Sequence, residues 1–315
     1  MSVLRINGGR ELLGSVRVHG AKNSVLPIIA ASILASGETV IHNCPDIEDV
    51  VAAVKILGHL GCEVRREGDT VIVNSATLTR LDIPHDLMRE MRSSVIFLGA
   101  VLARGGEATL SMPGGCELGP RPVDIHLKAL RTLGAEIVEE GGNIICKAPR
   151  LRGCRVNLSF PSVGATENAM LAASLADGTT VITNAAREPE IWDLQCYLRT
   201  LGVDARGAGT ATVTVTGKKI GANVEHRVIP DRIVASTFLA AAAVTKSEVE
   251  LTDVIPGHLA TVIDALREMG CDIASDSDAI RIKSDGKLRA VRPIITEPYP
   301  GFPTDSQPQL MAAAL

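Results

Sequence analysis

Aromatic residues are scarce in this chain of 315 residues, where they make up only 2% of the sequence. Nucleic-acid bases stack on aromatic side chains, so this scarcity argues against a broad surface for single-stranded nucleic acid. It also means that the hydrophobic core must be built mainly from Ala, Val, Leu and Ile, within a hydrophobic content of 46%.

A strong excess of either charge is missing as well, because 32 basic residues face 36 acidic ones and the net charge is -4. This balance provides no overall attraction to nucleic acid or to an anionic membrane, so an anionic ligand must be held by local basic residues. The sequence also contains no apolar run long enough to span a bilayer and no signal-peptide pattern at its N-terminus. We predict a cytoplasmic protein whose partners include neither nucleic acid nor membrane, and the sequence predicts no oligomeric state.

Paired cysteine motifs are absent, although the chain has seven cysteines. They are scattered, no CxxC pair suggests zinc, and an odd number fits a reducing compartment better than a set of disulfides.

A repeat of about seventy residues is visible when the chain is laid against itself. Its most regular marker is a glycine that follows an apolar residue and precedes an acidic, β-prone segment: Gly61, Gly134, Gly202 and Gly270, which are 73, 68 and 68 residues apart. Each copy predicts a buried helix of small residues, a strand, a second helix with a leucine stripe, and a β-hairpin. The strands are expected at residues 38–43, 107–112, 179–184 and 248–253.

A fifth copy of the repeat begins at Pro303 and stops inside its first helix at Leu315. A helix that stops in mid-pattern leaves an apolar face exposed, so we expect the sequence to be part of a longer protein. The alternative is a natural short C-terminal helix.

The stretch from Pro113 to Asp124 combines one thiol, one guanidinium and two carboxylates with several Gly and Pro residues. The apolar spacing after it predicts a helix with Pro122 at its first position and its end at Gly134. Cys116 would then precede a helix N-terminus, close to Arg121, and should ionise more readily than an ordinary thiol. Taken alone, Cys116 could equally be a small buried hydrophobic residue.

Charged residues recur at the predicted starts of the other helices. Together they predict a cationic pocket with a few carboxylates, which suits an anionic substrate that undergoes proton transfer. Individually, each could be an ordinary solvated charge or a helix cap. The residues are Lys22, Arg92, Arg121 and Arg232, with Glu188, Asp231 and Asp305.

Several motifs in order resemble the UDP-N-acetylglucosamine 1-carboxyvinyltransferase family of enolpyruvyl transferases, from Val3 to the last residue. They are Gly20-Ala21-Lys22-Asn23, Pro113-Gly114-Gly115-Cys116, Arg121-Pro122-Val123-Asp124, Ser162-Val163-Gly164-Ala165-Thr166, Asn184-Ala185-Ala186-Arg187-Glu188-Pro189-Glu190, Pro230-Asp231-Arg232 and Phe302-Pro303-Thr304-Asp305. The sister 3-phosphoshikimate 1-carboxyvinyltransferases share the repeat fold but lack this cysteine loop.

The resemblance implies an inside-out α/β barrel in which six repeats form two domains. Residues 22–229 would be the first domain, with three complete repeats and the cysteine loop. Residues 1–21 and 230–315 would belong to the second domain, with one complete repeat and the start of another. The family's later cationic residues lie beyond Leu315, so a polypeptide that ended there should turn over little.

The reaction that the resemblance implies is transfer of the enolpyruvyl group of phosphoenolpyruvate to the 3-hydroxyl of UDP-N-acetylglucosamine. Phosphate is released, no metal or cofactor is needed, and the step is the first committed one of peptidoglycan synthesis. Cys116 is implied as the proton donor, which can also add covalently to phosphoenolpyruvate, and Asp305 as the carboxylate beside the sugar hydroxyl.

The resemblance also implies which residues bind the two substrates. Lys22 and Asn23 would bind phosphoenolpyruvate, with Arg121 near its phosphate. The residues for the UDP-sugar would be Arg92, Arg121, Pro122, Val123, Asp124, Ile125, Ser162 and Val163. Gly164, Glu188, Asp231 and Arg232 complete the predicted site.

Two other functions stay open on the sequence alone. The first is a non-catalytic UDP-sugar-binding paralogue, or an inactive fragment of the same fold. The second is an enolpyruvyl transferase with another acceptor, such as shikimate 3-phosphate.

Overall fold

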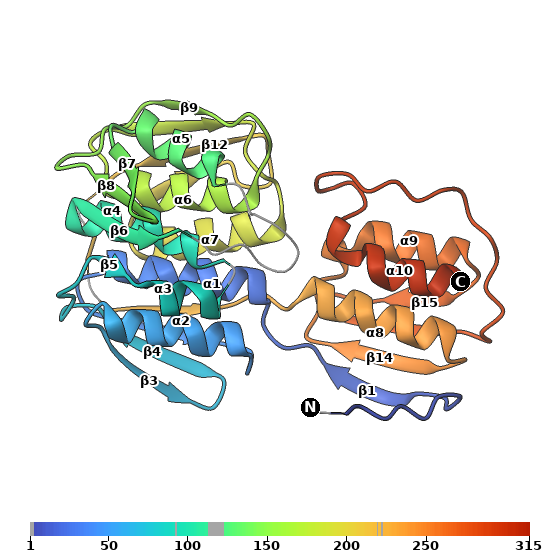
Figure 1. The fold of residues 1–315 in the computed structure, drawn as a ribbon. Helices are drawn as coiled ribbons and strands as arrows, with labels where there is room; N and C mark the ends of the chain where they lie inside the picture. The colour runs from blue at the N-terminus through green and yellow to red at the C-terminus, as the bar shows by residue number, and fades with distance from the viewer. Residues whose placement is uncertain (1–2, 92, 113–122, 219, 222) are drawn as a thin grey trace. The chain divides into compact units, whose positions relative to one another are not determined.

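The computed structural model describes residues 3–91, 93–112, 123–218, 220–221 and 223–315. The chain divides into two compact units (Figure 1). Unit 1 comprises Met1–His19 and Pro230–Leu315, and unit 2 comprises Gly20–Ile229. Each unit has its own hydrophobic core.

Unit 2 contains three four-stranded sheets with one shared topology. In each sheet an edge strand pairs in parallel with the next strand, and the remaining pairs are antiparallel. The first sheet has the order β13-β2-β4-β3, with β13 (Val224–Arg227), β2 (Glu38–His42), β4 (Thr70–Asn74) and β3 (Glu63–Glu67). The second has the order β5-β6-β8-β7, with β5 (Asp82–Ile83), β6 (Glu107–Ser111), β8 (Asn143–Lys147) and β7 (Glu136–Glu140). The third has the order β9-β10-β12-β11, with β9 (Arg155–Asn157), β10 (Thr179–Thr183), β12 (Thr212–Thr216) and β11 (Asp204–Arg206).

The helices of unit 2 are of two kinds, as the repeat predicts. The small-residue helices are α1 (Lys22–Ala31), α4 (Phe97–Gly105) and α6 (Val163–Ala173), with the short η1 (Ser32–Leu34) and η2 (Ser94–Ile96) beside them. The second helices are α2 (Glu48–His59), α5 (Asp124–Thr132) and α7 (Pro189–Thr200), and α3 (His85–Glu90) is an additional short helix. Most residues of α1, α4 and α6 are buried, because apolar side chains surround each helix. The sheets lie outside these helices (Figure 1), which confirms the inside-out arrangement of repeated α/β units.

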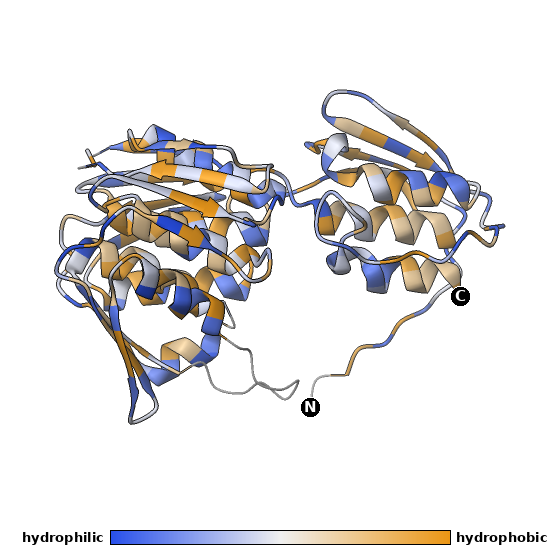
Figure 2. Cartoon of the chain, turned by 90° about the horizontal axis from the view of Figure 1, so that it is seen from above, coloured by the Kyte–Doolittle hydropathy of each residue, from blue (hydrophilic) through white to orange (hydrophobic). Residues whose placement is uncertain are grey.

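The strands show the alternation of a sheet with one buried face. Strand β10, for example, alternates between exposed or half-buried Thr179, Val181 and Thr183 and buried Thr180 and Ile182. Figure 2 shows the same alternation as hydrophobic and hydrophilic bands along the strands. Among the described residues, no helix combines the length and the apolar character needed to cross a membrane.

The repeated glycines end the second helix of each repeat. Gly61, Gly134, Gly202 and Gly270 have φ angles of 95°, 102°, 85° and 106°, which an L-residue with a Cβ rarely adopts. The N–H that follows each glycine donates to a leucine carbonyl five residues earlier; Cys62 bonds Leu57, for instance, at 3.0 Å. This is a Schellman cap, and it explains why leucine and glycine recur together in the sequence.

Five predicted boundaries are wrong by one or two residues. All four predicted strands end one residue early, at His42, Ser111, Thr183 and Thr252. After three of them Asn43, Asn184 and Asp253 have φ angles of 61°, 55° and 55° and turn the chain out of the sheet. The helix after the cysteine loop begins at Asp124, with Val123 as its N-cap, rather than at Pro122.

Unit 1 holds one sheet of the same kind, in the order β1-β14-β16-β15. Its strands are β1 (Leu13–Arg17), β14 (Glu248–Thr252), β16 (Ala279–Lys283) and β15 (Asp272–Ser275). Its helices are α8 (Arg232–Val244), η3 (Pro256–Leu259), α9 (Ala260–Glu268), η4 (Thr304–Ser306) and α10 (Gln307–Ala314).

Each unit receives one edge strand from a distant part of the chain. Strand β1 precedes α1 in the sequence but pairs with β14 of unit 1, and β13 takes the equivalent edge position beside β2 in unit 2. The chain therefore enters unit 2 after β1 and leaves it after β13, which makes unit 1 discontinuous in sequence.

Candidate active site

Each predicted site residue that the structure describes lies at or beside the N-terminus of a helix. Here the first backbone N–H groups lack intrahelical partners and the helix dipole is positive, so an anion is stabilised. Lys22 and Asn23 open α1, Asp124 and Ile125 open α5 after Val123, and Ser162, Val163 and Gly164 form the start of α6. Glu188 is the N-cap of α7, Asp231 and Arg232 open α8, and Asp305 lies in η4, which leads into α10.

Four of the predicted site residues lie outside the described part of the chain: Arg92, Cys116, Arg121 and Pro122. Their roles stay predictions.

The starts of α5 and α6 lie against each other in unit 2. The Ser162 hydroxyl accepts a hydrogen bond from the Ala165 N–H at 3.3 Å and caps α6. A Cβ at Gly164 would lie 2.9 Å from the Cε1 of His126, so glycine allows this close approach. The sequence segments around Asp124 and Gly164 are therefore brought together.

Asn168 of α6 holds α5 and α6 together inside the core, and the sequence did not predict this role. Its amide nitrogen lies 2.8 Å from Nδ1 of His126 and donates to the Val95 carbonyl at 3.0 Å. Its amide oxygen accepts from the Gly99 N–H at 2.7 Å. Asn168 is fully buried, so these bonds tie α4, α5 and α6 together inside the core. The available signal was the run of polar residues Thr166, Glu167 and Asn168 within a helix that is otherwise made of small and apolar residues.

The loop before α7 is held to the first turns of α6. The N–H of Ala186 donates to the Thr166 hydroxyl at 3.0 Å, and both residues are buried. This bond places the segment that leads to Glu188 beside the start of α6.

Asp193 on α7 holds the first turn of α1, two residues from Lys22. Its carboxylate accepts hydrogen bonds from the Ser24 hydroxyl and, at 3.2 Å, from the Ile229 N–H. Its other oxygen lies 2.9 Å from Nε2 of His226. Asp193 is fully buried, and such a carboxylate is stable in the core only when it is bonded in this way. The network gives Lys22 and Asn23 a rigid base.

In unit 1, the start of α8 is joined to η4. The Asp231 carboxylate caps α8 by accepting from the N–H groups of Ile233 and Val234 at 2.7 and 3.0 Å. The guanidinium of Arg232 donates to Oδ2 of Asp305 at 3.3 Å. The structure thus brings together the three predicted site residues of this unit.

The six described cysteines are free thiols, and their environment makes them unreactive. Burial raises the pKa of Cys44 and Cys146 to about 12 and that of Cys62 to about 11. Burial also raises the pKa of Cys154, Cys196 and Cys271. Since the thiolate is the nucleophile, all six are weak nucleophiles at neutral pH.

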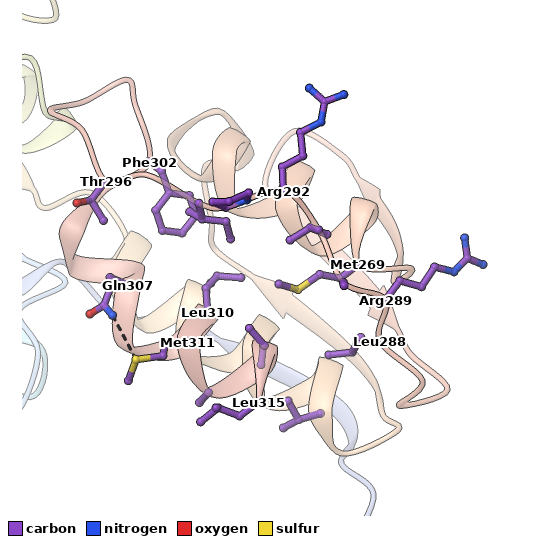
Figure 3. A pocket seen from close by; sticks show the side chains of 18 of the residues that line it. Met269, Leu288, Arg289, Arg292, Thr296, Phe302, Gln307, Leu310, Met311 and Leu315 are labelled. Carbon is purple, nitrogen blue, oxygen red and sulfur yellow. Dashed lines mark hydrogen bonds between the residues drawn. The ribbon is translucent and has the colours of Figure 1, made fainter.

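Within the described ranges, no group of three or more His, Cys, Asp or Glu side chains is arranged to hold a metal ion. A groove of about 760 Å³ lies in unit 1, between α10 and the segment of residues 286–302. Its walls are mostly apolar, and none of the predicted site residues that the structure describes lines it. Figure 3 shows Met269, Phe302 and Leu310 around the groove, with the guanidinium groups of Arg289 and Arg292 pointing away from it.

Comparison with known proteins places the chain in a family. The family model of EPSP synthase (3-phosphoshikimate 1-carboxyvinyltransferase) matches residues 6–315. A UDP-N-acetylglucosamine 1-carboxyvinyltransferase 2 of Caldanaerobacter subterraneus subsp. tengcongensis is 50% identical over 312 residues, which are 99% of this chain and 75% of the relative. A UDP-N-acetylglucosamine 1-carboxyvinyltransferase 1 of Symbiobacterium thermophilum is 50% identical over 98% of this chain and 71% of its own length.

Solved structures agree on the fold. The enolpyruvyl transferase NikO from Streptomyces tendae superposes with a TM-score of 0.86 at 27% identity, over 98% of this chain and 74% of that one. An EPSP synthase from Acinetobacter baumannii superposes with a TM-score of 0.69 at 20% identity, over 97% of this chain and 70% of that one. At 20% identity, the similarity to the EPSP synthase shows only that the two chains share a fold.

Proposed function

Because the chain belongs to the EPSP synthase family of enolpyruvyl transferases, and is 50% identical to UDP-N-acetylglucosamine 1-carboxyvinyltransferases, we propose that it catalyses their reaction. It transfers the enolpyruvyl group of phosphoenolpyruvate to the 3-hydroxyl of UDP-N-acetylglucosamine and releases phosphate. This step commits the sugar to peptidoglycan synthesis.

The observation that carries the proposal is the gathering of charged and capping residues at helix N-termini. Both substrates bear phosphate, and an N-terminal turn offers a phosphate free N–H groups and a positive dipole. Lys22 adds a full positive charge at the start of α1. Two residues further along, the Ser24 hydroxyl donates a hydrogen bond to the buried Asp193 carboxylate. These features support a rigid anion site at α1.

The reaction requires a base, an acid and a stabilised leaving group. The proton of the sugar 3-hydroxyl passes to the Asp305 carboxylate as the oxygen bonds to C2 of phosphoenolpyruvate, and C3 takes a proton from the Cys116 thiol. The Cys116 thiolate then takes a proton back from C3, the double bond re-forms, and the bond between C2 and the phosphate oxygen breaks. Lys22 and Arg121 stabilise the negative charge of the departing phosphate.

Two further assignments are proposals on the same basis. Residues 22–229 form one domain of three repeats, and residues 1–21 with 230–315 belong to a second. The protein works in the cytoplasm, since free thiols such as Cys44 and Cys146 suit a reducing compartment.

The decisive experiment is a measurement of phosphate release that requires both phosphoenolpyruvate and UDP-N-acetylglucosamine. We expect Cys116→Ala to abolish most of this release and to prevent alkylation by the epoxide phosphonate fosfomycin. Cys154→Ala is the matched control, because Cys154 is a half-buried thiol whose sulfur donates to the Thr132 carbonyl. Cys154→Ala should leave both the phosphate release and the alkylation by fosfomycin unchanged.

Three results would contradict the proposal. Saturable binding of the UDP-sugar without phosphate release would indicate a non-catalytic binder. Phosphate release with shikimate 3-phosphate in place of the UDP-sugar would indicate another acceptor. Full activity of Cys116→Ala would remove the proton-donor role.

A further inference from the structure

Arg232 and Asp305 form an ion pair with unequal partners. The Arg232 side chain is only 5% exposed, whereas the Asp305 side chain is 44% exposed. One nitrogen of the guanidinium donates to Oδ2 of Asp305 at 3.3 Å. The buried member of the pair is therefore the fixed one, and the exposed carboxylate is held against it.

Two more polar contacts lock the element that carries Asp305 onto α8. The Ser306 hydroxyl donates to the Ser236 hydroxyl at 3.1 Å in a buried position. The Gln309 amide donates to the Thr237 hydroxyl at 3.1 Å. With the ion pair, these contacts run along one side of α8 and fix the backbone of η4 and α10. Among the residues that the structure describes, Arg232 alone binds the side chain of Asp305 and sets its orientation.

The two oxygens of Asp305 are used differently. Oδ2 accepts from Arg232, and within the described part of the chain Oδ1 accepts no hydrogen bond. A carboxylate held at one oxygen presents the other in a defined direction, which a general base requires. Oδ1 is thus the oxygen available for a substrate proton.

We propose that Arg232 is a positioning residue for Asp305 and not a ligand of either substrate. This inference rests on the proposed function, in which Asp305 takes the proton of the sugar 3-hydroxyl. Arg232 holds Oδ2 so that Oδ1 receives that proton. The substrate-binding role predicted for Arg232 from the sequence is replaced by a role that acts through Asp305.

The test separates turnover from binding. In the two-substrate phosphate-release assay, Arg232→Gln should lower kcat by about 100-fold, which is the effect of a misplaced catalytic group. KM and the equilibrium binding of UDP-N-acetylglucosamine and phosphoenolpyruvate should change by less than about threefold. Arg232→Lys keeps the charge and should recover at least about tenfold of the lost kcat. An arginine that bound substrate would instead raise KM and weaken binding.

Two controls isolate the pair. Arg281→Gln removes an exposed arginine of the same unit that binds Glu250 at 2.8 Å, and it should leave kcat unchanged. In an Asp305→Asn background, Arg232→Gln should cause no further loss of kcat, because the two residues act as one. A wild-type kcat in Arg232→Gln, or additive losses in the double variant, would overturn this inference alone. An unmodified protein that released no phosphate would overturn the proposed function itself.

Discussion

The carboxylate of Asp193 lies 2.9 Å from Nε2 of His226, and both side chains are buried. Asp193 belongs to α7 and His226 to β13, the strand that closes the first sheet of unit 2. The same carboxylate accepts the Ser24 hydroxyl from α1. One buried charge therefore connects three elements that are far apart in the sequence, close to the helix start that carries Lys22.

Replacement of Asp193 should be strongly destabilising. Asp193→Ala leaves three buried polar partners without their acceptor, and we expect a loss of about 3 kcal/mol in the free energy of unfolding. Urea unfolding followed by circular dichroism measures this loss. The matched control is Asp204→Ala, since Asp204 forms an exposed pair with Arg206 at 2.6 Å and such pairs contribute at most about 1 kcal/mol. Equal losses in the two variants would contradict the role assigned to the network.

Two glycines in helices should respond to alanine in opposite directions. A Cβ at Gly99 of α4 would lie 2.4 Å from the backbone oxygen of Asn168, so Gly99→Ala must push α4 and α6 apart at a cost of about 1–3 kcal/mol. Gly58 lies in α2, and no described atom apart from its chain neighbours and the backbone of that helix lies within 4 Å of the added methyl group, so Gly58→Ala should stabilise the protein by about 0.5–1 kcal/mol. Thermal unfolding should show a lower midpoint for the first variant and a higher one for the second. A raised midpoint for Gly99→Ala would show that the two helices do not approach as closely as described.

The buried thiols predict a loss of stability in alkali. The pKa of Cys146 rises from an ordinary 9.0 to about 12 on burial, and that of Cys62 to about 11. The folded protein thus keeps protons that the unfolded chain loses above pH 9. The contribution of these thiols to the free energy of unfolding is therefore fully present below about pH 9. It falls as the pH rises toward 11–12, by about 1.4 kcal/mol per pH unit for each thiol.

Urea unfolding between pH 8 and pH 10.5 measures this slope. Cys146→Ala should make it shallower, because one thiol with a raised pKa is removed. A slope that is the same in wild type and Cys146→Ala would contradict the assignment.

Thiol labelling should separate Cys116 from the other cysteines. Iodoacetamide at pH 7.5 should modify Cys116 in the native protein, while burial and raised pKa values protect the rest, including Cys44 and Cys62. Peptide mass mapping identifies the labelled site, and labelling in urea, where all seven cysteines should react, serves as the control. Preferential labelling of a described cysteine would count against an activated Cys116.

Much of the fold could be predicted because its signals are local. The leucine and the glycine that cap each second helix lie within six residues of each other, so their recurrence at Gly61 and Gly134 marked the repeat directly. The small-residue helices and their strands also follow from periodicity within short windows. The edge strands β5 and β9 could not be predicted in this way, because strands of two and three residues are too short to show an alternating pattern.

The candidate site was predicted only in part. Glycine-rich and proline-rich starts of helices pointed to Lys22, Ser162 and Asp231, since caps are local features. The residues that hold them were missed. Asn168 and Asp193 find their partners across tens to more than a hundred residues, and neither stands in a motif.

The sequence by itself determined the repeat, the order of helices and strands within it, and the helix starts at which charged residues gather. These depend on backbone preferences and side-chain periodicity over a few residues. Only the tertiary structure decided that β1 pairs with β14 and β13 with β2, and that Arg232 meets Asp305 across 73 residues. Such pairings depend on which surfaces are buried together, and burial is a property of the whole folded chain.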